Sequence, residues 1–229
     1  MATQYSVTIS LDNDTLAWLK GKSLRVFKGV LTGSAGLPVV WFSQNTFSQQ
    51  LTFSWEETYG GYVTDAGKPV SGFSVLDVSS SSMSLGQKLT ANNDGSTNVT
   101  NDGEPGMITV MAAVDDTRDW TGGMGQVVND KLSPICAFDI GGSGSAIVME
   151  PYERLVLVFE STAAVNTGTV IAAAISSSIT IELDGSDTSR TVSFSKDGGW
   201  SGNTGGWATI NLPDLDLAKA LIMSQPATH

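Results

Sequence analysis

The chain has few of the side chains that most often carry catalysis or bind metals. The only histidine is His229, the last residue, and the only cysteine is Cys136. Without an internal histidine, the chain has no Ser-His-Asp or Cys-His nucleophile and no histidine ligand for zinc or iron. Cys136 lies in an apolar, strand-like context and is expected to be a core residue. The acidic turns lack calcium-loop spacing, so we expect no metal and no cofactor.

Paired carboxylates are the remaining catalytic candidates, because glycoside hydrolysis needs two of them around one bond and no histidine. Glu56 and Glu57 are adjacent, and neighbouring residues of a regular strand point to opposite faces. Glu150 and Glu153 flank Pro151 and Tyr152 at the start of a strand, where an exposed corner is expected. Neither pair is expected to form a glycosidase site.

A set of large aromatic residues lies beside glycine or polar residues, where core strands would carry Val, Ile, Leu or Phe. Trp and Tyr rings on loops commonly stack on a flat ligand ring, while polar neighbours bind its substituents. The alternative is that these rings plug the ends of the fold. The predicted ligand-binding residues are Trp55, Tyr59, Tyr62, Trp120, Gln126, Trp200 and Trp207.

Three functions remain open. The first is a lectin-like module that binds a carbohydrate or another ring-shaped ligand, and it predicts that Trp55→Ala and Trp120→Ala weaken binding more than stability. The second is a cofactor-free cyclase, isomerase or pericyclase, in which Gln126, Asn129 or Arg118 polarises a carbonyl in an aromatic pocket. A deep, dry pocket would favour this enzyme, and a shallow groove the lectin. The third is a membrane-active, toxin-like protein that uses the alternating segment 169–195.

The elements that must position these residues are strands. Apolar residues alternate with polar ones at 7–11 and 51–55, and similar runs recur about a dozen times, separated by Asp-Gly turns. This pattern predicts an all-β fold, either an antiparallel β-sandwich or a closed β-barrel. Residues 53–62 and 194–207 share a short Phe-Ser and Gly-Gly-aromatic pattern, so a fold built from two similar halves stays open. The runs 179–183 and 190–195 predict a hairpin.

One all-β domain over residues 1–229 is the expected organisation. The Ser/Asn/Gly-rich stretch 79–106 is expected to be a long surface excursion or a linker. Leu215, Ala218 and Leu221 have helical spacing, with Asp214 as the expected N-cap, so at most one short C-terminal helix is predicted. No apolar run is long enough for a membrane helix.

Charge restricts the partners. The formal net charge is −11, which repels nucleic acid. The partner expected from the aromatic residues is a small molecule or a glycan, and a homo-oligomer stays open. Lys20, Lys22, Arg25 and Lys28 form one basic stripe, expected on a solvated edge strand. The first residues show no signal-peptide pattern, which favours a cytoplasmic protein and leaves secretion open.

Overall fold

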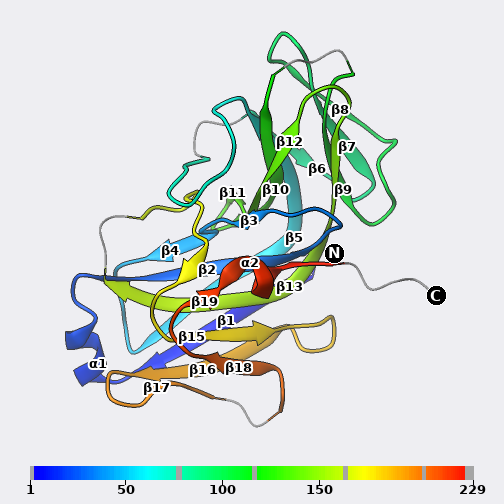
Figure 1. Cartoon of the computed structure of the whole chain (residues 1–229). Helices are drawn as coiled ribbons and strands as arrows, with labels where there is room; N and C mark the ends of the chain where they lie inside the picture. The colour runs from blue at the N-terminus through cyan, green and yellow to red at the C-terminus, as the bar shows by residue number, and fades with distance from the viewer. Residues whose placement is uncertain (1–2, 76–78, 115–117, 162–164, 203–204, 225–229) are drawn as a thin grey trace.

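Two β-sheets pack face to face in a computed structural model, which describes residues 3–75, 79–114, 118–161, 165–202 and 205–224 (Figure 1). The first sheet contains β1 (Gln4–Leu11), β3 (Leu37–Pro38), β5 (Gln50–Thr64), β6 (Ser79–Met83), β10 (Trp120–Val128), β11 (Lys131–Pro134), β12 (Cys136–Gly141), β16 (Ser189–Ser195) and β17 (Gly199–Ser201). Its order is β17-β16-β1-β5-β10-β12-β3, with β6 paired to β5 and β11 to β10.

The second sheet has the order β18-β15-β13-β9-β7-β8, and β2 joins it by pairing with β13, β20 and β4. Its strands are β2 (Lys22–Leu31), β4 (Phe42–Gln44), β7 (Gln87–Ala91), β8 (Thr97–Thr100), β9 (Ile108–Ala112), β13 (Ala146–Ser161), β15 (Ser178–Glu182), β18 (Ala208–Asn211) and β20 (Ile222–Met223). Two short strands, β14 (Ala173–Ala174) and β19 (Leu215–Asp216), pair separately.

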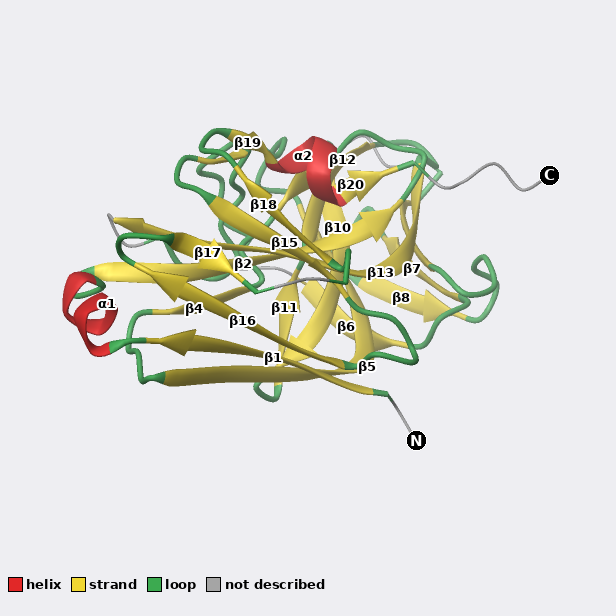
Figure 2. Cartoon of the chain, turned by 90° about the horizontal axis from the view of Figure 1, so that it is seen from below, coloured by secondary structure: helices red, strands yellow, loops and turns green. Residues whose placement is uncertain are grey.

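The main core lies between the two sheets, because alternate residues of the strands point inward. Val7 and Ile9 of β1 and Leu155 and Leu157 of β13 belong to this core, and all four are fully buried. The outer face of the second sheet is covered as well, since Phe27 of β2 packs with the helix α2 (Leu217–Leu221). Figure 2 shows α2 over this face and α1 (Asn13–Trp18) at one end of the molecule.

The predicted all-β class is confirmed, and so is the short C-terminal helix, which begins later than expected. Asp216 rather than Asp214 caps α2, because its carboxylate accepts the backbone N–H of Lys219. A second short helix, α1, forms where no helix is predicted, and Asp12 caps it in the same way. The pairing is also not wholly antiparallel, since β1/β16, β7/β9 and β2/β20 are parallel pairs.

Two predicted connections are wrong. The runs 179–183 and 190–195 form no hairpin, because β15 pairs with β13 and β18 in the second sheet while β16 pairs with β1 and β17 in the first. The stretch 79–106 is no plain excursion, since it contains β6, β7 and β8. Leu89 and Ala91 of β7 point into the main core, which anchors this Ser-rich segment.

The basic stripe is not an exposed edge either. Strand β2 lies in the interior of the second sheet, and its residues from Leu24 to Val30 are buried on both faces. Arg25 forms an ion pair with Glu160 on the outer face, whereas Lys28 points into the core. Among the described residues, no helix has the length and apolar character needed to cross a membrane.

Candidate functional site

An open groove lies where β5 and β6 of the first sheet meet β13 and β7 of the second. It begins as a hollow of about 820 Å³ and continues into one of about 530 Å³. The two hollows share Ser84, Leu85, Gln87 and Gly106, and we call them together the groove. The larger hollow is lined by Glu57, Thr58, Tyr59, Ser82, Met83, Ser84, Leu85, Gln87, Gly106, Glu150, Pro151 and Glu153.

Two β-bulges, one in each sheet, supply carboxylates to this groove. On β5, Tyr59 pairs with Gln126 and Trp55 with Val128, so the three residues 56–58 face a single residue of β10. On β13, Tyr152 and Leu155 pair with the consecutive residues 29 and 28 of β2, which leaves Glu153 and Arg154 as extra residues. Bulges redirect side chains and are frequent beside functional sites.

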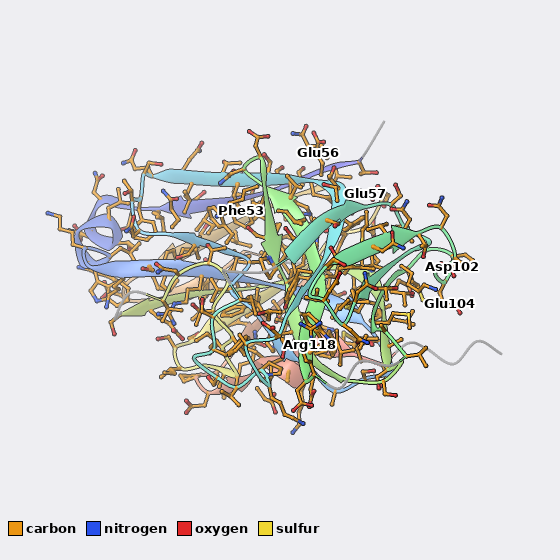
Figure 3. The ribbon with its side chains drawn as sticks, turned by 90° about the horizontal axis from the view of Figure 1, so that it is seen from above. Phe53, Glu56, Glu57, Asp102, Glu104 and Arg118 are labelled. Carbon is orange, nitrogen blue, oxygen red and sulfur yellow. The ribbon has the colours of Figure 1, made fainter. Side chains whose placement is uncertain are left out.

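The bulge in β5 separates the two adjacent glutamates. Glu57 lines the groove, whereas Glu56 lines a different hollow beside Gln4 and Asn129. Figure 3 shows Glu56 and Glu57 together at the rim of the molecule, and Asp102 and Glu104 on the loop beyond them. The expectation that the two glutamates do not share one cleft agrees with this arrangement. Glu153, however, is no exposed corner, because only 12% of its side chain is accessible.

Glu153 belongs to a buried polar cluster behind the groove wall. Its Oε2 atom accepts hydrogen bonds from Lys28 Nζ at 2.5 Å and from Trp55 Nε1 at 2.9 Å. The Lys28 ammonium also lies over the rings of Trp41 and Trp55, at 5.3 and 5.1 Å from their centroids. The Oε1 atom of Glu153 is buried and has no hydrogen-bond partner among the described residues.

Burial sets the protonation of Lys28. The side chain is fully buried, and loss of hydration lowers its pKa from 10.5 to about 8, although the charge and hydrogen bond of Glu153 oppose this effect. An ammonium in the core is tolerated only because a carboxylate and aromatic faces surround it. Lys28 therefore holds Glu153 in place as long as the lysine is protonated.

The carboxylates on the groove side of this cluster affect the pKa of two tyrosines. Tyr5 donates a hydrogen bond to Glu57 Oε1 at 3.1 Å, and its ring stacks on Trp55 with centroids 5.7 Å apart. Burial, the hydrogen bond to Glu57 and the charge of Glu153 raise the pKa of Tyr5 to about 12. Burial, followed by the charges of Glu153 and Glu57, also raises the pKa of Tyr59 well above its usual value.

With this geometry in place, comparisons with known proteins add no relative. No protein-family model matches the chain, and neither a curated protein nor a solved structure does. Within the described ranges, no three His, Cys, Asp or Glu side chains are grouped to hold a metal ion. A functional assignment must therefore come from the groove and the cluster behind it.

The predicted aromatic residues lie in different places from those expected. Five of the six rings belong to strands and are buried, whereas Trp207 precedes β18 and is half-buried. Of the predicted set, Tyr59 lines the groove, Trp55 supports Glu153 from behind, and Gln126 donates a hydrogen bond to the Glu56 carbonyl. The expected position on loops is wrong for the five strand rings, because these are buried in the hydrophobic core, and the role of the set in ligand binding stays a prediction.

The other predicted residues are distributed over the fold. Tyr62 faces the outer side of the first sheet and donates a hydrogen bond to the Cys136 carbonyl. Trp120 is buried under Arg118, whose guanidinium carbon lies 4.4 Å from the ring centroid. Trp200 stacks on Phe159 at 5.2 Å. Trp207 lies under Arg190, whose guanidinium carbon is 4.8 Å from the ring centroid. The structure therefore does not bring the predicted set into one site.

Sequence reasoning missed Lys28 and Tyr5. The signal for Lys28 was present, since the run 24–30 reads Leu-Arg-Val-Phe-Lys-Gly-Val and places two cations inside an apolar strand. A charged residue in such a run needs a buried partner of opposite charge. The partners, Glu160 and Glu153, lie more than a hundred residues away along the chain, so no local pattern identifies them.

Proposed function

We propose that this protein is a lectin-like module that binds an oligosaccharide in the groove between β5–β6 and β7–β13. The observation that carries the proposal is the groove itself, which is open, consists of two adjoining hollows and is lined by both polar and apolar side chains. The exposed carboxylate of Glu57 and the side chains of Ser82, Ser84 and Gln87 can bind sugar hydroxyls.

The apolar part of the lining suits the ring of a sugar. Leu85 and Pro151 contribute aliphatic surface beside the polar groups, and the largely buried Tyr59 and Met83 complete the lining. Sugars present apolar C–H faces as well as hydroxyls, and aromatic side chains with polar neighbours are suited to both. The two hollows share a wall, which favours a ligand of several sugar units over a single one.

The competing functions receive less support. A cofactor-free cyclase requires a deep, dry, aromatic-lined pocket, whereas this groove is open and polar, with Tyr59 as the one aromatic residue of its larger hollow. The segment 169–195, on which the membrane-active proposal depends, contributes strands to both sheets and to the β14/β19 pair. A liposome-leakage assay tests that third proposal directly.

A glycan array followed by calorimetric titration tests the lectin proposal. We expect Glu57→Gln to weaken binding of the best glycan about tenfold, because a hydrogen bond to a charged group is worth about 1.5–3 kcal/mol. Glu56→Gln is the matched control, since it removes the same charge from the neighbouring residue outside the groove. Absence of binding to every glycan at high protein concentration would contradict the proposal.

A further inference from the structure

Strand β18 forms one edge of the second sheet. It pairs with β15, and no further strand of the described chain pairs with it. At the start of this pairing, the Trp207 carbonyl accepts the backbone N–H of Glu182. Because backbone groups alternate in direction along an antiparallel strand, Ala208, Ile210 and Leu212 direct their N–H and C=O groups away from β15. The strand therefore presents a row of backbone donors and acceptors that another strand can bind.

The side chains on this edge are apolar and exposed. Ile210 lies opposite Ile179 of β15, and residues paired in this way share one face of a sheet. Ile179 is 1% exposed in the main core, whereas Ile210 is 57% exposed. Leu212 is 83% exposed, and Ile175, shortly before β15, is 70% exposed. The apolar face of the second sheet thus continues to an edge where none of the described residues covers it.

This edge carries no charge, although the chain as a whole is strongly acidic. Residues 161–181 and 198–213 contain no Asp, Glu, Lys, Arg or His, and these two stretches meet where β15 pairs with β18. The formal net charge of the chain is −11, so two copies repel each other. The repulsion is weakest where neither copy carries a charge. A second copy of this chain is therefore the partner that the edge suits, since a charged partner finds no opposite charge on it.

We propose that two copies of this protein associate through β18, in an antiparallel arrangement with two-fold symmetry that joins their second sheets. The pairing is self-complementary, because Ile210 lies opposite the partner's Ile210 and Ala208 lies opposite the partner's Leu212. The outward backbone groups of these residues then bond to each other across the interface. The two isoleucines cover each other, which removes from water the apolar surface that the single chain exposes.

The pairing edge is separate from the groove. Strand β18 contributes no residue to the lining of the two hollows. In the order of the second sheet it lies at one end, whereas β7, which supplies Gln87 to the groove, lies next to the other end (Figure 1). A dimer formed through β18 therefore carries two grooves, and a ligand with repeated units gains avidity by binding both. The dimer itself does not depend on the function proposed for the groove.

Sedimentation velocity of the full chain between about 1 and 200 µM tests the proposal, because pairing through one short strand gives a small and weak interface. We expect a shift from monomer to dimer over this range, and a tighter dimer when added salt screens the net charge. Ile210→Lys places two like charges face to face at the symmetry axis and should weaken association at least about tenfold. Leu212→Lys is a second disrupting variant.

Val114→Lys is the matched control. It adds the same charge at an apolar residue that is 69% exposed and lies near Gly144, away from β18. This variant should dimerise as the wild type does. Thermal unfolding of all three variants verifies that they are folded.

Hydrogen exchange of the segment 207–213 identifies the interface by its backbone. The amides of Ala208, Ile210 and Leu212 should exchange rapidly at low protein concentration and become protected at high concentration. A chain that stays monomeric over the whole range, or a dimer without this protection, would overturn the proposal. So would a dimer that Ile210→Lys and Leu212→Lys leave unchanged. Equal loss of the dimer in Val114→Lys would overturn it too, because added charge in general, and not β18, would then control association.

Discussion

Replacing Lys28 by Met and Glu153 by Gln in one variant removes both charges of the buried pair and keeps two side chains of similar size. The wild-type lysine has a pKa of about 8 in the folded protein, against the ordinary lysine value of 10.5 in the unfolded chain. Between these pH values unfolding takes up a proton, so the free energy of unfolding rises with pH. At about 1.36 kcal/mol per pH unit, the full rise is about 3 kcal/mol.

Urea unfolding followed by tryptophan fluorescence at several pH values from about 7 to 10 measures this effect. The stability of the wild type should rise relative to that of the double variant, which has no titrating group at either position. Tyr5 does not interfere, because its pKa of about 12 in the folded protein lowers stability only above pH 10 and is present in both proteins.

A second variant provides an independent test of the cause. Glu153 raises the pKa of Lys28 through its charge and its hydrogen bond, so Glu153→Gln alone should move the rise in stability to lower pH. Parallel stability curves for the wild type and the double variant would refute the assignment of a buried, weakly basic lysine. An unchanged position of the rise in Glu153→Gln would refute the coupling between the two residues.

The remaining predictions concern the core. Trp55→Ala and Trp120→Ala should each lower the free energy of unfolding by about 3–5 kcal/mol, because both rings are buried; urea midpoints close to wild type would contradict this. Gly123→Ala should destabilise the protein by at least about 1–3 kcal/mol, because a Cβ atom there would lie 2.1 Å from the Cys136 carbonyl oxygen; Gly185→Ala, with open space around it, is the control. Cys136 should resist alkylation in the folded protein and react in urea, because burial raises its thiol pKa to about 12, and mass spectrometry after iodoacetamide treatment measures this.

The sequence predicted the elements of the fold better than their partners. Alternation identified β1 and residues 51–55 of β5 because each of these stretches buries one face, and the apolar context of Cys136 indicated the core position that the structure shows. Local patterns do not encode long-range pairing, which is why β15 and β16 were assigned to one hairpin although they belong to different sheets. The alternation of apolar and polar residues along a strand is the same whichever strand it pairs with, so it does not identify the partner.

The candidate site was harder to predict because two of its three carboxylates, Glu57 and Glu153, lie at bulges. A bulge has no sequence signature comparable to a helix cap. In a regular strand, alternation says only that Glu56 and Glu57 point to opposite faces, and not which of them lines the groove. The aromatic residues were misplaced for a related reason. Glycines beside Tyr62 and Trp120 were interpreted as loop residues, whereas in β5 and β10 they allow two strands and their covering side chains to approach closely.

The parallel pairing of β1 with β16 has a consequence for biosynthesis. Residues 6–11 lie in the middle of the first sheet, between residues 50–54 on one side and residues 189–194 on the other. On the ribosome, β1 can pair with β5 early, but its second edge has no native partner until most of the chain has emerged. Such an edge can pair with other nascent chains, and non-local pairing of this kind slows folding. The late arrival of β16 therefore makes the β1 edge the place where this sheet is completed last.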